Sequence, residues 1–427
     1  MSLYLGIDFG TSGARCAVID GEAKVQVEGR YPWNMVQESD LPSCWYQALL
    51  TLLEGIPLDL RQEIQAIAIN GTSATVMVCD GLGKPVGTPL LYNDARGASL
   101  LEQLQKIAPA NNTVLSATSS LVKLLWFSQL EFFAQAKYFL HQADWLGFLL
   151  HGQLGISDYH NALKLGYDVE KLKYPDWLAQ LDVAILLPKI VAPGDAIAPI
   201  TPEIATRFHF PPDCLICAGT TDSIAAFFAS GATSPGEAVT SLGSTLAVKL
   251  LSRHRIENSR YGIYSHRFPD FSKLGTPEDL WLVGGASNTG GAVLRHFFTN
   301  LELENLSREI HAETSSKLDY YPLLQPGERF PINDANLQPR LEPRPENDVE
   351  FLHGLLASIA RIEAKGYELL QELGADKLSR VYTAGGGAAN DKWTKIRQGY
   401  LQVPIVSSIN NEAAYGSALL AMWGTNR

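Results

Sequence analysis

The stretch LYLGIDFGTSGARCAVID, residues 3–20, decides the fold. Apolar residues stand at every second position of 3–9, the period of two that is typical of an extended chain. Gly10 and Gly13 then allow backbone angles that other residues avoid. Residues 14–19 continue as a second strand, so the chain is predicted to open with a hairpin.

Asp8 is the unusual residue of this hairpin, because it is a carboxylate at the end of an apolar strand. The turn beside it is rich in backbone and hydroxyl donors, which suit phosphate oxygens. Phosphate next to a carboxylate is repelled unless a cation lies between them. We therefore predict a hairpin that holds metal-bound phosphate. The alternative is an Asx-turn, in which Asp8 accepts hydrogen bonds from the amides of its own turn.

The same pattern recurs in AVTSLGSTLAVKLL, residues 238–251, as a strand, a Gly-Ser-Thr turn and a strand. Two such hairpins in one chain suggest a duplicated α/β domain, with the two turns facing each other across a central cleft. The 427 residues also exceed one ordinary core. The small, Pro- and Gly-containing stretch 229–236 marks the boundary. We expect an N-terminal domain at 1–230 and a C-terminal domain at 231–427, with the helix 411–424 as a candidate to pack back on the first.

Composition excludes several classes of function. Hydrophobic content of 46% and charged content of 19% describe a soluble globular protein. The net charge of -11 argues against nucleic-acid binding, which requires a basic face. No signal peptide precedes the first strand, and no apolar run reaches the ~18 residues of a membrane span. The sequence thus predicts a cytoplasmic protein with no membrane partner.

The five cysteines fit a reducing compartment. Cys214 and Cys217 form a CxxC motif, but they lie in a predicted strand and would point to opposite faces. Redox or metal chemistry of this pair is therefore disfavoured.

Asp222 follows a short apolar strand at 215–218 and precedes a helix at 223–229. The loop after a strand is the usual place for catalytic groups in α/β sheets. Asp222 is also a suitable N-cap for the helix that follows, and both roles are compatible. In the loop at 71–75, Thr72, Ser73 and Thr75 form either a hydroxyl-rich sugar contact or a capped turn.

The remaining chain is assigned more coarsely. Residues 121–136, apolar on nearly every face, predict a buried helix. Six prolines within 320–345 predict an excursion without helix, and Asp348 is expected to cap a long helix that ends at Gly374. Three loops that expose backbone amides, 10–13, 243–245 and 385–390, each follow a strand. Together with two acidic residues at strand ends, these three loops are a more specific signal of function than a single Gly-rich loop.

On these residues the sequence resembles the FGGY carbohydrate kinases, and the likeness runs nearly end to end. The matching strings are GIDFGTSGAR, NDAR, KLLWF, GTTDS, SLGST, PLLQPGER, TAGGGAANDKW and NEAAYGSALLA. The opening motif is shared with other ATPases of this scaffold, whereas GTTD, PGER and EAAYGSA together indicate this family. The resemblance implies two duplicated ribonuclease-H-like domains of the actin-like ATPase type.

The resemblance also implies transfer of the γ-phosphoryl group of ATP to a sugar hydroxyl. Asp222 would be the general base and a substrate contact, and Asp8 would contact the sugar and hold Mg²⁺ through water. The residues implied to bind ATP are Thr11, Ser12, Gly243, Ser244 and Thr245 at the phosphates, and Gly386, Gly387, Asn390 and Trp393 around adenine, Trp393 by its ring face. Positioning and charge neutralisation dominate such chemistry.

One departure from the family pattern bears on the substrate. Many xylulose kinases carry a QMHG-like string where this chain has Thr72, Ser73, Ala74 and Thr75. Without the bulky Met and His, Ser73 becomes the candidate sugar contact. We therefore expect a ketopentose as substrate, D-ribulose first and D-xylulose second. The alternatives are a glycerol or polyol kinase and a non-enzymatic actin-like nucleotide switch; the expected state is a monomer or homodimer.

Overall fold

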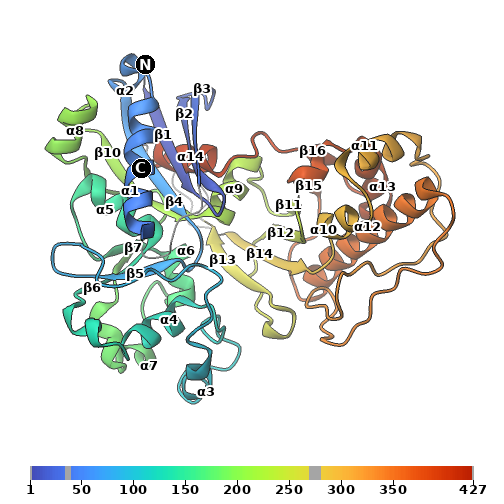
Figure 1. Ribbon diagram of the computed structural model, residues 1–427, viewed down its shortest axis with the longest axis horizontal. Helices are drawn as coiled ribbons and strands as arrows, with labels where there is room; N and C mark the ends of the chain where they lie inside the picture. Colours follow the sequence, from blue (N-terminus) through green and yellow to red (C-terminus); the bar gives the residue numbers. More distant parts are fainter. Residues whose placement is uncertain (1, 34–39, 269–279, 426–427) are drawn as a thin grey trace. The chain divides into compact units, whose positions relative to one another are not determined.

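The structure is a computed structural model that describes residues 2–33, 40–268 and 280–425 (Figure 1). The chain forms two units. The N-terminal unit combines Met1–Ala229 with Glu412–Arg427, and the C-terminal unit is Ser230–Asn411. The last helix therefore belongs to the same unit as the first strand.

The N-terminal unit is built on a six-stranded mixed sheet with the strand order β3-β2-β1-β4-β10-β9. β1, β2 and β3 form an antiparallel meander, β4 and β10 join β1 in parallel, and β9 is antiparallel at the edge. The strands are β1 (Leu3–Phe9), β2 (Gly13–Asp20), β3 (Val25–Pro32), β4 (Ile64–Gly71), β9 (Ala196–Pro199) and β10 (Leu215–Thr221). Two short pairs accompany this sheet, β5 (Val76–Cys79) with β6 (Tyr138–His141) and β7 (Ile156–Asp158) with β8 (Lys189–Val191).

The helices of this unit are α1 (Leu41–Gly55), α2 (Leu58–Arg61), α3 (Leu101–Leu104), α4 (Ser120–Phe127), α5 (Gln142–His151), α6 (Tyr159–Ala162), α7 (Asp176–Ala179), α8 (Pro202–Phe208), α9 (Asp222–Ser230) and α14 (Ala413–Gly424). The alternation along β1 assigns its two faces. Leu3, Leu5 and Ile7 enter an apolar core together with α1 and α5. The other face, which carries Gly6, lies under α14 (Figure 1).

The C-terminal unit repeats five strands of this topology in the order β13-β14-β12-β11-β15-β16, with its sixth strand, β13, antiparallel to β14 at the opposite edge. β11, β12 and β14 form an antiparallel meander, and β15 and β16 continue from β11 in parallel, as β4 and β10 do from β1. The strands are β11 (Glu237–Leu242), β12 (Leu246–Ser252), β13 (Tyr264–Phe268), β14 (Leu280–Ser287), β15 (Arg380–Ala384) and β16 (Ile405–Ser407). The mixed α/β architecture of two duplicated domains is thus confirmed.

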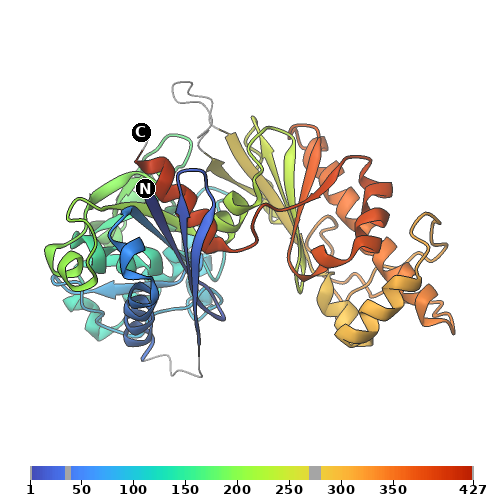
Figure 2. The same ribbon diagram turned by 90° about the horizontal axis from the view of Figure 1, so that it is seen from above.

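The helices of the C-terminal unit are α10 (Gly291–Phe297), α11 (Asn300–Glu309), α12 (Asp348–Glu372) and α13 (Asp391–Leu401). α12 packs against β12, and α13 and α11 pack against α12 (Figure 2). A fully buried ion pair joins these elements: Arg397 of α13 donates to Glu363 of α12 from Nε and from Nη2, at 2.7 Å each. Thr240 of β11 and Thr383 of β15 complete the pair's hydrogen bonds, which leaves no bare buried charge.

Two details of the predicted helices are wrong. The helix expected at 121–136 ends at Phe127, and a separate 3₁₀ helix, Glu131–Gln135, follows. The chain must turn there to enter β6, and Ser128 Oγ donates to the Leu125 carbonyl at 2.7 Å. The cap of α12 is Asn347 rather than Asp348, because its side chain accepts from the N–H groups of Val349 and Glu350. In the described residues, no helix is both long and apolar enough to cross a membrane.

Small residues allow α14 to lie directly on the sheet. A methyl group at Gly6 would come within 1.9 Å of the Ala414 carbonyl oxygen, and one at Gly416 within 1.8 Å of the Ala225 carbonyl oxygen. Both neighbours are backbone atoms, which cannot rotate away. The composition of α14, rich in Ala, Gly and Ser, is therefore a packing requirement.

We expect Gly6→Ala to destabilise the protein by about 3 kcal/mol, because overpacking a closed site forces backbone shifts. Gly21→Ala is the matched control, since a methyl group there meets nothing within 4 Å. Urea unfolding of both variants measures the difference. Equal stability of the two variants would contradict the close packing of α14.

Candidate active site

The carboxyl ends of three parallel strands bring the polar residues of the N-terminal unit together. Asp8 of β1 pairs in register with Asn70 of β4, and Thr220 of β10 pairs with Asn70 from the other side. Thr221 is the last residue of β10, so Asp222 begins α9 at this same edge of the sheet. The register thus places Asp8 and Asp222 at the ends of strands that both flank β4.

Asp8 is an almost fully buried carboxylate, with 4% of its surface exposed. Arg15 donates from Nη1 to Asp8 Oδ2 at 3.2 Å. Burial, with a further contribution from the charge of Asp222, nevertheless raises the pKa of Asp8 from 3.8 to about 7. Arg15 opposes this shift and Glu412 adds slightly to it. The site is therefore short of positive charge.

Arg15 is a residue that the sequence analysis did not single out. Besides Asp8, it contacts Ser12 Oγ at 3.1 Å and Glu412 at 3.3 Å. Its place two positions into the second strand of the hairpin, beside Asp8 on the paired strand, could have identified it. Thr11 and Ser12 are both exposed in the turn, and the hydroxyl of Thr11 bonds no described group.

Several buried polar atoms at these strand ends lack a hydrogen-bond partner. They are Asp8 Oδ1 on β1, Asn70 Oδ1 on β4 and Thr221 Oγ1 on β10, along with Asn161 Oδ1 on α6, which packs on β10. Elsewhere in the described chain only Arg61 Nε is in this condition. Leaving a buried polar atom unpaired costs about 1–3 kcal/mol. Such a concentration of unpaired oxygens indicates a place that a ligand completes, and a carboxylate oxygen beside neutral oxygens suits a hydrated Mg²⁺.

Asp222 contacts the first turn of its own helix through the next residue. Asp222 Oδ1 accepts from the N–H of Ser223 at 2.7 Å, and the residue is partly exposed. An N-cap side chain normally accepts from the second or third helical N–H instead.

The loop after β4 uses two of its three hydroxyl groups internally. Thr72 Oγ1 and Thr75 Oγ1 lie 2.5 Å apart, and Gln142 Oε1 accepts from Thr72. Lys123 Nζ also stabilises the loop, because it donates to the Ala74 carbonyl at 2.7 Å. Ser73 is half-buried, and its hydroxyl bonds no described group. Of the two interpretations left open for this loop, Thr72 and Thr75 therefore fit the fixed turn, and Ser73 is available to a ligand.

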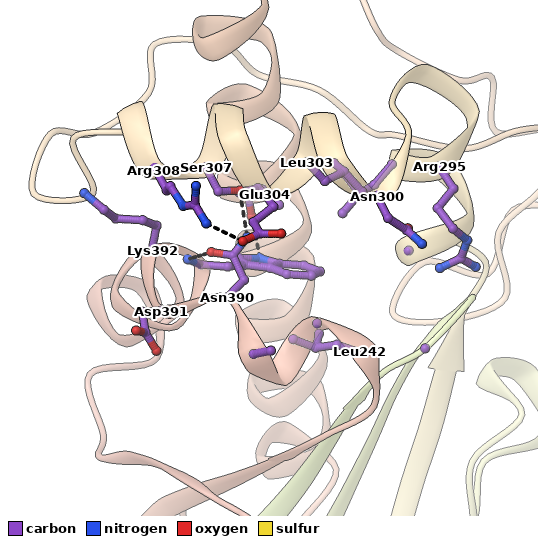
Figure 3. Close-up of a pocket in the computed structure, with 18 of the residues that line it drawn as sticks. Leu242, Arg295, Asn300, Leu303, Glu304, Ser307, Arg308, Asn390, Asp391 and Lys392 are labelled. Atoms are coloured by element: carbon purple, nitrogen blue, oxygen red, sulfur yellow. Dashed lines mark hydrogen bonds and ion pairs between the residues drawn. The ribbon is translucent and has the colours of Figure 1, made fainter.

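The C-terminal unit contains a cavity of about 800 Å³, within the range of small-molecule sites (Figure 3). It is lined from three directions: the turn after β11, helices α10 and α11, and the segment from β15 into α13. The lining residues are Leu242, Gly243, Ser244, Gly291, Leu294, Arg295, Asn300, Leu303, Glu304, Ser307, Arg308, Leu356, Gly386, Gly387, Ala389, Asn390, Asp391, Lys392 and Trp393.

The turn Gly243–Thr245 offers free backbone donors to this cavity. The carbonyls of Gly243 and Ser244 accept from Gly291 and Ala292, which fixes the turn against α10. The N–H groups of Ser244 and Thr245 donate to no group of the described chain, and both residues are exposed. Unpaired amides in a Gly-containing turn form a concave anion site.

The opposite end of the cavity is tightly built around Gly387 and Trp393. Gly386–Ala389 is a single 3₁₀ turn, and a methyl group at Gly387 would meet Trp393 Cζ3 at 2.6 Å. Trp393 is 2% exposed and donates from Nε1 to the Leu356 carbonyl. The indole ring thus packs against Gly387. Direct contact of the ring face with adenine stays a prediction.

Asn390 has two internal bonds. Its Oδ1 caps α13 by accepting from the N–H of Trp393, and its Nδ2 donates to Ser307 Oγ at 2.9 Å. Helix α11, which supplies Ser307, Leu303 and Glu304, was not predicted from the sequence. Its signal was present, because Thr299 and Glu302 form a capping box.

The structure therefore gathers the proposed site residues into two groups. Asp8, Thr11, Ser12, Ser73 and Asp222 belong to the N-terminal unit. The residues proposed for ATP at the second hairpin and at 386–393 line the cavity of the C-terminal unit, apart from Thr245, which belongs to the turn beside it.

Comparison with known proteins identifies a family for both parts of the chain. Residues 3–229 match the N-terminal domain of the FGGY family of carbohydrate kinases, and residues 238–425 match the C-terminal domain of that family. A xylulose kinase from Bacillus subtilis is 23% identical over 451 aligned residues, which cover 100% of this chain and 89% of that protein.

Solved structures share the fold. A ligand-bound xylulose kinase from Lactobacillus acidophilus matches with a TM-score of 0.83 at 19% identity, over 100% of this chain and 90% of the other. A glycerol kinase from Plasmodium falciparum with ADP matches with a TM-score of 0.84 at 16% identity, with the same coverage. With both of its domains matched, the chain belongs to the FGGY family of carbohydrate kinases and is an ATP-dependent sugar kinase.

Proposed function

We propose that this kinase phosphorylates a ketopentose, with D-ribulose as the first candidate. The observation that carries the site assignment is the pair Asp8 and Asp222 at neighbouring strand ends, among unpaired buried oxygens. The observation that bears on the sugar is Ser73, whose hydroxyl is available where bulkier residues would fill the space. D-xylulose is the second candidate, because full-length relatives are named xylulose kinases.

Asp222 is proposed as the general base. Its carboxylate accepts the proton of the attacking sugar hydroxyl, so that the hydroxyl oxygen forms a bond to the γ-phosphorus as the bond to the ADP oxygen breaks. The proton passes to Asp222 and from there to solvent. The bond from the Ser223 N–H holds one oxygen of this carboxylate in place.

Asp8 and Arg15 are proposed to organise the charge around the transferred phosphoryl group. Mg²⁺, when bound, neutralises phosphate charge. Asp8 Oδ1, which has no partner in the protein, would hold the ion through water, while Oδ2 remains with Arg15. The nucleotide is proposed to occupy the cavity of the C-terminal unit. Its base would lie near Gly387 and Ser307, and its phosphates at the turn Gly243–Thr245.

The role of Asp222 can be separated from helix capping with Asp222→Asn. Asparagine accepts from the Ser223 N–H as aspartate does, but it cannot take the sugar proton. We expect thermal stability and ATP binding to stay near wild type, while kcat falls by roughly 10²–10⁴. Normal turnover of this variant with ATP and D-ribulose saturating would remove Asp222 from the chemistry.

Asp8→Asn should show a pH-dependent gain in stability. Because the pKa of Asp8 is raised to about 7 in the fold, the folded protein holds a proton there that the unfolded chain releases above about pH 4. This stabilising contribution is complete below pH 4 and is lost as the pH rises through 7. Asparagine is neutral throughout, so the variant should exceed wild type in stability by a few kcal/mol at pH 8, with a gap that narrows toward pH 5.

Urea unfolding at pH 5, 6.5 and 8 measures this gap. Added Mg²⁺ and ATP should raise the Tm of wild type more than that of Asp8→Asn, and the variant should lack turnover. A stability difference that does not change with pH would show that Asp8 is not the titrating group, and full activity would overturn its proposed role.

The sugar can be identified with a panel of ketoses and polyols, read by coupled ADP release. We expect D-ribulose to give the highest kcat/KM among the ketoses. Ser73→Ala should lower kcat/KM for that sugar about fivefold, the worth of one hydrogen bond, and leave the KM for ATP unchanged. A hundredfold preference for glycerol, about 2.7 kcal/mol in barrier height, would overturn the ketopentose assignment.

A further inference from the structure

Arg295 of α10 reaches back across its own helix to the turn Gly243–Thr245. Its Nη2 donates to Ser244 Oγ at 2.9 Å. A methyl group at Gly291, one turn earlier, would lie 3.0 Å from Arg295 Nη1. The guanidinium group therefore lies over the junction between Gly291 and the turn. Figure 3 shows Arg295 at one end of the cavity, with Lys392, Arg308 and Asn390 toward the other.

The charges that line this cavity are distributed unevenly. Arg308 forms an ion pair with Glu304 on the same helix. Lys392 donates to the Ile310 carbonyl at 2.8 Å and forms no ion pair with any described residue. Arg295 forms no ion pair with any described residue, and Ser244 Oγ is the acceptor for only one of its five N–H donors. Of the two lining cations without an ion pair in the described chain, Arg295 is the one at the end where the turn exposes its amides (Figure 3).

A polyphosphate at this turn needs local cations, because the protein as a whole carries a net charge of -11. The free N–H groups of Ser244 and Thr245 are neutral donors. A planar guanidinium presents paired donors that match phosphate oxygens, and charge-assisted bonds of this kind are the stronger ones. Arg295 is exposed, so binding of an anion costs it little desolvation.

From this geometry we propose that Arg295 binds the polyphosphate of the nucleotide and positions it over the turn Gly243–Thr245. The inference rests on the proposed occupation of the cavity by ATP, and it adds a residue that the family resemblance did not indicate. The Ser244 contact holds the guanidinium in place before the nucleotide arrives, which reduces the entropy lost on binding. Arg295 thereby makes the site selective for nucleotides over nucleosides.

The test is a series of calorimetric titrations with adenosine, AMP and ADP, on wild type, Arg295→Gln and Arg295→Lys. Arg329→Gln is the matched control: Arg329 is an exposed arginine of the same unit with no described side-chain partner, and it lies outside the cavity lining. We expect Arg295→Gln to weaken ADP binding about 10- to 100-fold and adenosine binding less than twofold. The ADP affinity of Arg295→Lys should lie between those of wild type and Arg295→Gln, because lysine keeps the charge but loses the paired donors.

The salt dependence gives a second measurement. The affinity of wild type for ADP should fall between 50 and 300 mM KCl more steeply than that of Arg295→Gln, whereas Arg329→Gln should follow wild type. If Arg295→Gln weakened the binding of adenosine and ADP equally, the contact of Arg295 with Ser244 would have only a structural role, and the proposal would be overturned. An unchanged affinity for ADP would also overturn it. If wild type bound none of adenosine, AMP and ADP, the proposed occupation of the cavity by ATP would itself be wrong.

Discussion

The hydrogen-bond register of three parallel strands is the constraint on which the N-terminal site depends. Parallel strands end at the same edge of a sheet, so pairing β4 with both β1 and β10 brings Asp8 close to the start of α9. Side chains alternate between faces along a strand, and β1 therefore points Leu5 and Ile7 into the core while Gly6 lies under α14. A shift of one residue in this register would exchange the two faces. The same register therefore places the apolar side chains in the core and Asp8 in the site.

The same constraint imposes a cost. An acidic group with a pKa near 7 is one that burial has penalised, and Arg15 offsets only part of that penalty. The unpaired oxygens on β1, β4 and β10 add to the cost. A fold that needed only stability would place neutral, paired groups here. The buried acid and the unpaired oxygens at one edge of the sheet are what a site completed by a ligand requires. This explains why Asp8→Asn is expected to be more stable but inactive.

The two units share the order of five strands but differ in the chemistry at their first turns. In the N-terminal unit, the residue two positions before the turn glycine is Asp8; in the C-terminal unit it is Ser241. The second turn therefore has free amides without a carboxylate, and Arg295 adds a positive charge beside it. The buried pair Arg397 and Glu363 ties β11, β15 and the helices α12 and α13 together, so the segments that line the cavity are held by one network. The two units thus share a frame but carry different chemistry at corresponding turns, acidic in the first and basic in the second.

The sequence by itself determined the two hairpins, the duplicated α/β architecture and the chemical character of Asp8 and Asp222, because period-two alternation, glycine turns and a carboxylate at a strand end are local signals. The same local reading extended α4 too far, since the end of a helix that is apolar on every face depends on where the chain must turn. The partners of Asp8 and the roles of Thr72 and Thr75 were not readable, because Arg15, Glu412 and Gln142 reach them only through sheet pairing and helix packing. The charge balance of the cavity in the C-terminal unit likewise depends on Arg295 folding back over Gly291. Spacing along the chain thus identified which residues could carry the chemistry, whereas only the tertiary structure decided which of their hydrogen bonds were already taken and which remained for a ligand.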